Sequence, residues 1–498
     1  MTDSAPTNHG MAETCQGSPR PSDPLQGVRR VDFVGIGGCG MSGLARMLQS
    51  MGIQATGSDP VSSPITESLL ASGIPVRTNQ DGTEVPDDID LMVISAAIAP
   101  DHPEVLAAEQ RGVRIKTYAE GLGMVQHGRT ALCIAGTHGK STTAAMLCHI
   151  LITCGFDPGF IIGANCDQIG GGSRIGASRI PQGGPLAGDP GILVSEACEF
   201  NRSFHNHRPT VALINNIEED HLDIYGSLES IIEAFRDFAL MIPPAEEGGS
   251  LLISHDEAHR HQITPPLQCH VATFGFHPEA DYQVVWDQAV RRTGILRDGM
   301  WTIQWTNPMA GAHNALNAAA AVILAHQLGA EWEEAAEAMA AFGGLDRRTQ
   351  RLGDRGVEGG VVTVYDDYGH HPTEIERTLK ALRAEEQPDR LICVFQPHQH
   401  SRTRFLLEQF AESFAQADQV IVPPIYFVRD SEAEKQRVSA VDLVRRLQDR
   451  GTEARHVESF AGIVDLLEED LAAGDLLVIM GAGPVWTIAR DYLERSPS

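Results

Sequence analysis

The sequence has no apolar run long enough to cross a membrane, and its first residues have neither the basic start nor the apolar core of a signal peptide. Cysteines are few, nine in 498 residues, and no two of them form a C-x-x-C pair. An odd number of scattered cysteines predicts reduced thiols rather than a disulfide framework. We therefore expect a cytoplasmic protein with no membrane partner.

Positive charge is also scarce. Lysine and arginine number 38 against 66 aspartates and glutamates, so the formal net charge is -28. A general nucleic-acid binder needs a basic surface, and this balance argues against a nucleic-acid partner. It does not exclude phosphorylated ligands, because a few arginines and backbone amides in a cleft suffice to bind them.

A glycine loop, Gly136-Thr137-His138-Gly139-Lys140-Ser141-Thr142, lies between an apolar run at 131–135 and a helix-compatible stretch at 143–151. Strand, glycine loop, Lys-Ser and helix are together typical of a phosphate-binding loop. Lys140 would bridge the β- and γ-phosphates, and the Ser141 hydroxyl would face Mg²⁺. The sequence therefore predicts an ATP site. Because the spacing is shorter than the common G-x-x-x-x-G-K-[ST], a chance Gly-Lys-Ser turn is the alternative.

A second glycine loop, Gly35-Ile36-Gly37-Gly38-Cys39-Gly40, follows an apolar segment at 28–34 and precedes helical sequence at 41–51. This G-x-G-x-x-G in its strand-to-helix context predicts a Rossmann-like sheet that cradles a diphosphate. The diphosphate would belong either to NAD, with Asp59 placed to bind the ribose, or to a UDP-sugar. The ATP loop downstream and the lack of an obvious hydride-transfer site favour the UDP-type ligand.

The chain is long enough for two or three domains, and its apolar strand-like runs alternate with helix-compatible segments. We therefore predict an α/β fold with three domains. The predicted units are a disordered tail (1–27), a Rossmann-like domain (28–125), a P-loop ATPase-like central domain (126–344) and a Rossmann-like C-terminal domain (345–498).

Acids and an imidazole follow two neighbouring strands of the central domain. Glu196 follows one strand and His221 follows the next. Because carboxyl ends of parallel strands meet at one edge of a sheet, these two side chains and Ser141 are expected to converge on Mg²⁺, which takes few protein ligands. The other acids of the second segment are better explained as solvated groups favoured by a helix start: Glu218, Glu219 and Asp223.

Two polar segments likewise follow strands of the third domain. Residues 366–374 contain tandem carboxylates and two imidazoles, and residues 396–404 contain two arginines. Tandem carboxylates and imidazoles are too polar for a simple connection in the core, so they indicate a functional role. The guanidinium forks of Arg402 and Arg404 suit a carboxylate or phosphate, although an exposed basic turn is the alternative.

Taken together, these segments resemble the Mur ligase family, and within it the branch that joins L-alanine to UDP-N-acetylmuramate. The matching segments run from about residue 28 to Gly481-Ala482-Gly483 and are 33–45, 136–143, 216–221, His313-Asn314 with Asn317, Arg347-Arg348, 366–374 and 395–404.

The resemblance implies a cytoplasmic ATP- and Mg²⁺-dependent ligase of peptidoglycan precursor synthesis, and hence of cell-wall biogenesis, cell shape and division. It would be a monomer or weak homodimer. The lactyl carboxylate of UDP-N-acetylmuramate would take the γ-phosphate of ATP, and L-alanine would then attack the acyl phosphate. Either His370 or Glu196 would accept the amine proton.

The resemblance also assigns residues to each ligand. The sugar nucleotide would lie on Gly35, Gly37, Gly38, Gly40, Ser42 and Asp59. ATP would lie on Gly136 to Thr142 with His313, Asn314, Asn317 and Arg347. L-alanine and the phosphoryl group would meet Tyr368, His370, His398, Arg402 and Arg404. The implied catalytic residues are Lys140, Glu196, His221, His370 and Arg402, and the implied metal ligands are Ser141, Glu196 and His221.

The sequence departs from the family pattern at Glu196-Ala197-Cys198-Glu199-Phe200-Asn201, where Glu-Ala-Asp-Glu-Ser-Asp is usual. Glu196 is kept, but Cys198 and Asn201 replace two carboxylates. The nearest alternative function is a murein-peptide ligase that joins a recycled tripeptide to the same sugar nucleotide. Tyr368 and the 401–404 segment favour a single amino acid instead. An NAD-dependent oxidoreductase is the alternative from another class.

Overall fold

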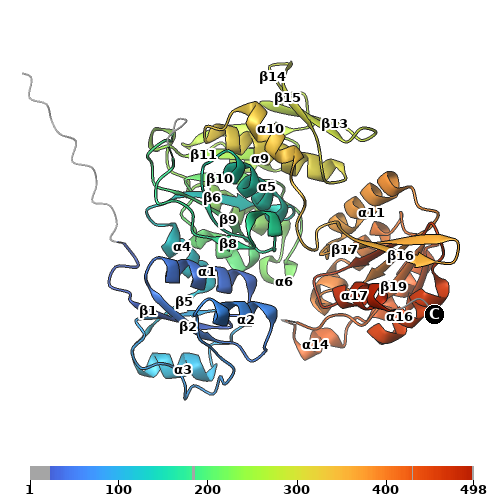
Figure 1. Ribbon diagram of the computed structural model, residues 1–498, viewed down its shortest axis with the longest axis horizontal. Helices are drawn as coiled ribbons and strands as arrows, with labels where there is room; N and C mark the ends of the chain where they lie inside the picture. The colour runs from blue at the N-terminus through green and yellow to red at the C-terminus, as the bar shows by residue number, and fades with distance from the viewer. Residues whose placement is uncertain (1–22, 182–185, 429, 496–498) are drawn as a thin grey trace, which may run out of the picture.

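The computed structural model describes residues 23–181, 186–428 and 430–495, which form three α/β domains, each built on its own sheet (Figure 1). The three-domain α/β prediction is confirmed. Residues 1–22 of the predicted tail lie outside the described residues. Its last part differs from the prediction, because residues 24–27 form a turn and Leu25 is buried in the N-terminal core.

The N-terminal domain has a parallel sheet in the order β3-β2-β1-β4-β5. The order reverses beside β1, so the glycine loop after β1 opens into the crevice where such sheets bind ligands. Its strands are β1 (Arg30–Val34), β2 (Gln54–Ser58), β3 (Val76–Arg77), β4 (Leu91–Ile94) and β5 (Arg114–Thr117). Its helices are α1 (Cys39–Ser50), α2 (Pro64–Ala71), α3 (Pro103–Gln110) and α4 (Tyr118–Gln126).

The central domain has a larger sheet in the order β15-β14-β13-β12-β11-β10-β6-β9-β7-β8. Pairing is parallel from β13 to β7 and antiparallel at both ends. Every residue of β6 is buried, as expected for a strand covered on both faces. Its strands are β6 (Thr130–Ala135), β7 (Gly159–Ile161), β8 (Ser173–Arg174), β9 (Ile192–Ala197), β10 (Val211–Ile214), β11 (Ser250–Ser254), β12 (His270–Gly275), β13 (Tyr282–Asp287), β14 (Arg292–Arg297) and β15 (Met300–Thr306).

The helices of the central domain cover both faces of this sheet, and α5 begins directly at the predicted phosphate loop. They are α5 (Lys140–Thr153), α6 (Leu222–Tyr225), α7 (Leu228–Ala239), α8 (Arg260–Ile263), α9 (Ala312–Gln327) and α10 (Trp332–Ala340). Among the described residues of this domain, three 3₁₀ segments accompany them: Asp167–Ile169, Phe200–Asn206 and Ala245–Glu247.

The C-terminal domain has a third sheet in the order β16-β17-β21-β18-β19-β20, parallel except for the β16–β17 pair. Its strands are β16 (Gln350–Val357), β17 (Gly360–Asp367), β18 (Leu391–Phe395), β19 (Gln419–Val422), β20 (Glu453–His456) and β21 (Leu476–Met480). Its helices are α11 (Pro372–Glu386), α12 (His400–Phe405), α13 (Leu407–Ser413), α14 (Glu432–Lys435), α15 (Ala440–Asp449), α16 (Phe460–Asp470) and α17 (Trp486–Glu494).

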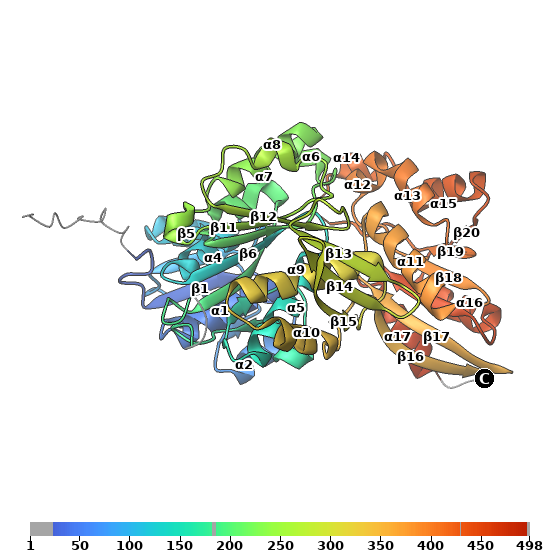
Figure 2. The ribbon, with the colours of Figure 1, turned by 90° about the horizontal axis from the view of Figure 1, so that it is seen from above.

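The domains meet through two different interfaces. Ile161 and Leu193 of the central domain are buried in the apolar core of the N-terminal domain. The C-terminal domain lies to one side of the other two, as Figure 1 and Figure 2 both show, and contacts the central domain through charged pairs such as Arg402–Asp220. Among the described helices, none combines the length and apolarity that crossing a membrane requires.

Candidate active site

A cleft of about 1200 Å³ is lined by residues of all three domains. This volume exceeds that of a pocket for one drug-sized ligand, roughly 300–1000 Å³. Its lining brings together Cys39 and Tyr118 of the N-terminal domain, Lys140, Glu196, His221, His313, Asn314 and Asn317 of the central domain, and Arg347, Tyr368, His370, His398 and Arg402 of the C-terminal domain. The cleft therefore has room for several reactants that approach from different domains.

The predicted phosphate loop forms one wall of this cleft. Gly139, with φ of +81°, precedes α5, and a Cβ at this position would lie 2.6 Å from Asn317 Oδ1. The backbone N–H of His138 donates to Asn216 Oδ1 at 2.7 Å, and Asn216 Nδ2 donates back to the His138 carbonyl at 3.2 Å. The loop is thus fixed by amide side chains while the N-terminus of α5 faces the cleft, an arrangement suited to phosphate.

Lys140 lies folded over the loop. Its Nζ donates to the carbonyl oxygens of Gly136 at 2.5 Å and Thr137 at 3.0 Å, and to Glu199 Oε2 at 2.8 Å. Burial lowers the pKa of Lys140, but the Glu199 carboxylate outweighs burial and the pKa is raised, so the ammonium stays charged. Glu199 lies in the segment that departs from the family pattern, and no role was predicted for it.

Ser141 and Glu196 lie together, as the metal-site prediction requires. Ser141 Oγ donates to Glu196 Oε2 at 2.9 Å, and the other carboxylate oxygen accepts the Gly163 N–H at 2.5 Å. A hydroxyl and a carboxylate at the carboxyl ends of two strands are oxygen ligands of the kind that Mg²⁺ prefers. The residues present therefore fit this ion.

His221 lies in the same cleft but beside other acids. Its Nε2 is 3.5 Å from Asp220 Oδ2 and 4.0 Å from Glu199 Oε1. Burial lowers the pKa of His221, which keeps the imidazole neutral and able to bind a metal. One ligand atom from each of Glu199, Asp220 and His221 lies within 4.8 Å of the others, so these acids extend the predicted metal-binding region.

The predicted ATP residues of α9 line the cleft behind the loop. Asn317 Nδ2 donates to Asn314 Oδ1 at 3.2 Å, and its own Oδ1 accepts from Thr143 Oγ1 at 3.2 Å. Burial lowers the pKa of His313 to about 4, so this imidazole is neutral. The structure thus brings Asn314 and Asn317 to the base of the phosphate loop.

Arg347 reaches the cleft from the connection between the central and C-terminal domains. It has a φ of +59°, its Nε donates to Asp366 Oδ2 at 3.1 Å, and its Nη2 donates to the Gly481 carbonyl at 2.6 Å. Burial, opposed by Arg347 and reinforced by Asp367, raises the pKa of Asp366 to about 6. These contacts fix the arginine at the entrance of the C-terminal domain.

Four of the five residues predicted to bind the amino acid lie around one point. The Tyr368 ring is 5.5 Å from the His370 ring, which is 5.8 Å from the His398 ring, and Arg402 Nη1 is 3.4 Å from His398 Nδ1. Burial, helped by Arg402, lowers the pKa of His370 to about 3. Arg404 does not join them, because it pairs with Glu434 at 2.8 Å and does not line the cleft.

The polar groups of the predicted sugar-nucleotide loop are bonded to nearby residues of the N-terminal domain. Asp59 Oδ2 accepts the Gly37 N–H at 2.9 Å, and the Ser42 hydroxyl donates to the Cys39 carbonyl at 2.9 Å. A Cβ at Gly40 would lie 2.6 Å from the Tyr118 hydroxyl. On this side the cleft is lined by Cys39 and Tyr118 rather than by the glycines, Ser42 or Asp59.

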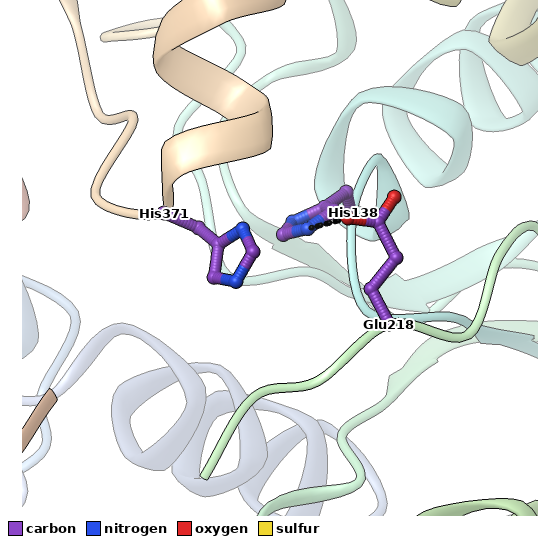
Figure 3. A group of neighbouring side chains, drawn as sticks. All are labelled: His138, Glu218 and His371. Atoms are coloured by element: carbon purple, nitrogen blue, oxygen red, sulfur yellow. Dashed lines mark ion pairs between the residues drawn. The ribbon is translucent and has the colours of Figure 1, made fainter. Parts of the chain in front are cut away.

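The interpretation of Glu218 as a solvated acid is wrong. Its side chain is 27% exposed, accepts a hydrogen bond from Thr373 Oγ1 of the C-terminal domain at 2.5 Å and faces His138 (Figure 3). Glu219 and Asp223 are exposed, as expected. Two of the groups that hold Glu218, Thr373 and Arg377, come from the C-terminal domain, more than 150 residues away in sequence, so the local sequence carries no signal for them.

Comparison with known proteins matches all three domains to family models. Residues 30–129 match "Mur ligase family, catalytic domain", residues 134–325 match "Mur ligase middle domain", and residues 347–483 match "Mur ligase, glutamate ligase domain". The chain is 36% identical to the UDP-N-acetylmuramate--L-alanine ligase of Lachnospira eligens over 470 residues, which cover 93% of this chain and 98% of that protein. It is 37% identical to the protein of the same name from Agathobacter rectalis, with the same coverage of 93% and 98%.

Two solved structures share the fold. The UDP-N-acetylmuramate-alanine ligase of Thermotoga maritima matches with a TM-score of 0.75 at 24% identity, covering 94% of this chain and 98% of that one. A murein peptide ligase of Psychrobacter arcticus matches with a TM-score of 0.70 at 23% identity, covering 93% and 98%. At these identities the likeness shows the three-domain fold alone.

Proposed function

Because the chain belongs to the Mur ligase family, we propose that it joins L-alanine to the lactyl carboxylate of UDP-N-acetylmuramate, with conversion of ATP to ADP and phosphate. Within the structure itself, one observation supports this proposal. The phosphate loop with Lys140 and the cluster around His370 and Arg402 line the same cleft, although they belong to different domains. The names of the similar curated proteins give the substrates.

In the first step, a lactyl carboxylate oxygen attacks the γ-phosphorus, the bond to the β-phosphate oxygen breaks, and ADP leaves. Lys140 remains charged throughout and exchanges its contact with Glu199 for phosphate oxygens. Bound to Ser141 and Glu196, Mg²⁺ would neutralise phosphate charge. This chain contributes mainly orientation and electrostatics, which phosphoryl transfer requires most.

In the second step, the alanine amine attacks the acyl carbon and phosphate leaves with the electron pair of the broken C–O bond. The amine gives up its proton to His370 or Glu196. The low pKa of His370, about 3, keeps its imidazole neutral and therefore able to accept a proton, but only as a weak base. Arg402 and Tyr368 lie beside it, where the guanidinium suits the alanine carboxylate.

The proposed role lies in peptidoglycan precursor synthesis, with a cytoplasmic location and a monomeric or weakly dimeric state as further predictions. The recycled tripeptide is the second candidate acceptor, because the Psychrobacter arcticus murein peptide ligase shares the fold at a TM-score of 0.70. Family membership argues against the NAD-dependent oxidoreductase.

The test is phosphate release by the purified full chain with MgATP and UDP-N-acetylmuramate, with L-alanine, other amino acids or the tripeptide added separately. We expect release that requires L-alanine, with the amide product identified by mass. Release only with tripeptide would transfer the assignment to the second candidate. Lys140→Met should abolish release, whereas Lys380→Met, an exposed lysine on α11, should leave it unchanged.

A further inference from the structure

The imidazole of His138 lies between two carboxylates that belong to two domains. Its Nδ1 is 3.2 Å from Glu374 Oε1, on the first turn of α11, and its Nε2 is 3.5 Å from Glu218 Oε2, in the segment after β10. The side chain is only 7% exposed. The phosphate loop therefore contacts the C-terminal domain through this side chain.

The start of α11 is docked around this imidazole. Thr373 Oγ1 donates to Glu218 at 2.5 Å, and Arg377 Nη2 donates to the same carboxylate at 3.2 Å. The His371 ring lies 4.6 Å from the His138 ring, and its Nε2 is 3.0 Å from the Glu219 carbonyl, as Figure 3 shows in part. His371 Nδ1 accepts the Thr373 N–H at 3.3 Å, so both of its ring nitrogens have protein partners and neither is free for a metal.

The charges of the group are complementary. Burial lowers the pKa of His138, but Glu218 and Glu374 outweigh burial and raise it to about 9. Burial raises the pKa of Glu218, but His138, Thr373 and Arg377 bring it down to about 2. Burial also raises the pKa of Glu374, but His370, His138 and Arg348 hold it well below its usual range. Six other titratable or charged groups interact with this set, one of them (Asp220) by way of His371: Arg348, His313, His370, His371, Asp220 and Asp367. An imidazolium between two carboxylates results.

The same residue is part of the backbone that surrounds the phosphates. His138 N–H and carbonyl are both bonded to Asn216, and Gly139 with Lys140 follows directly. A force on the His138 side chain therefore acts on the loop that positions Lys140. Loss of the Glu374 carboxylate would leave His138 with a charged partner only in its own domain, Glu218.

We propose that His138 is a positioning residue that couples docking of the C-terminal domain to the conformation of the phosphate loop. Phosphoryl transfer then takes place when the domain that supplies His370 and Arg402 is already docked, and the acyl phosphate is protected from water. The inference rests on the proposed ligase function for its kinetic consequence, but not for its structural one.

The test compares His138→Gln, Glu374→Gln and the double variant with Glu376→Gln, an exposed acid on the same helix. For His138→Gln we expect kcat to fall about tenfold, the KM for ATP to change less than about threefold, and more than one phosphate to be released per amide formed. The double variant should lose no more activity than His138→Gln, because each single substitution already removes the same His138–Glu374 interaction. Glu376→Gln should behave as wild type.

Small-angle scattering of the full chain, with Mg²⁺ and a non-hydrolysable ATP analogue, provides the structural readout. We expect the analogue to compact the wild type and Glu376→Gln but not His138→Gln or Glu374→Gln. Equal compaction in all four, one phosphate per amide, or a raised KM for ATP at unchanged kcat would overturn the proposal. If the wild type forms no amide with any acceptor, the ligase function fails, while the scattering comparison still decides the coupling.

Discussion

The N-terminal and C-terminal domains both contact the central domain, but through interfaces of opposite chemistry. On the N-terminal side, Ile161 and Leu193 are at most 2% exposed and join the apolar core of the neighbouring domain. On the C-terminal side, the contacts are charged: Arg402 with Asp220, His138 with Glu374, and Arg377 with Glu218.

The difference indicates which domain moves. Apolar burial is non-directional and is lost in proportion to the area exposed, so separating the N-terminal interface is costly. Charged groups recover hydration when they separate, and their attraction depends on alignment. We therefore expect the N-terminal domain to stay fixed, while the C-terminal domain docks and leaves during the reaction cycle.

The largest expected effect comes from breaking the Arg402–Asp220 pair, whose side chains are 6% and 8% exposed. Arg402→Ala leaves a buried carboxylate without its partner, a loss of about 3–5 kcal/mol, and removes a residue of the proposed alanine site. We expect kcat/KM for amide formation to fall about 100- to 1000-fold. Arg404→Ala is the matched control, because Arg404 pairs with Glu434 within its own domain. Equal losses in both variants would contradict the assignment.

Next in size is a change at the apolar interface. A Cβ at Gly123, on α4, would overlap the backbone carbonyl oxygen of Asn206 in the central domain. Gly123→Ala should lower the free energy of unfolding by about 1–3 kcal/mol, measured by denaturant titration. Gly356→Ala should leave the free energy of unfolding unchanged, because the new Cβ would meet no other part of the chain within 4 Å. If Gly123→Ala lost nucleotide-induced compaction but kept its stability, the N-terminal interface would be the one that moves, which would contradict the comparison.

The charged interface should respond to pH through His138. Its pKa in the docked state is about 9, against an ordinary value of 6.5. A raised pKa means that the stabilisation is fully present below about pH 6.5 and is lost as the pH rises through about 9. Because Glu218 stays beside His138 when the C-terminal domain leaves, only part of this shift depends on docking. We expect the docking equilibrium, followed by scattering, to weaken about tenfold over this pH range in the wild type, which corresponds to one pKa unit. His138→Gln should show a flat profile over the same range, and an identical decline in this variant would exclude His138 as the cause.

The smallest effect should come from the edge of the same interface. Arg291 and Glu385 pair at 2.8 Å, but their side chains are 39% and 24% exposed. Burial raises the pKa of Glu385, so its charge is not strongly favoured there. Glu385→Gln should change kcat/KM less than about twofold, because exposed pairs contribute little. A larger loss would show that peripheral charges also hold the domain.

The fold could be predicted wherever strands are buried on both faces. The apolar runs of β6, β10, β18 and β21 are continuous in sequence, and the structure has them as strands. The strands from β11 to β15 were not predicted. None of β13 to β15 is buried along its whole length, so the continuous apolar run that marks the inner strands is missing from their sequences. The edge strands β16 and β20 were missed for the same reason.

The site could be predicted where its signal is local. The phosphate loop is one segment with its own helix, and the clustering of Tyr368, His370 and His398 follows from strand ends. Glu199, Glu218 and Glu374 were not found, because their partners lie in distant segments and a lone glutamate resembles a solvated one. Arg402 and Arg404 are equivalent in sequence, but residues two apart on a helix such as α12 face nearly opposite directions. Only the packing of that helix shows which arginine enters the cleft.

The order of the three sheets along the chain has a consequence for synthesis on the ribosome. All strands of the first sheet are present once Thr117 has been made, and the sheet needs no later strand to complete its pairing. Its apolar core, however, includes Ile161 and Leu193, which are translated later. During that interval an apolar face is uncovered on an otherwise complete domain. The nascent chain is therefore most prone to aggregate between these two points, and a chaperone would protect it best there.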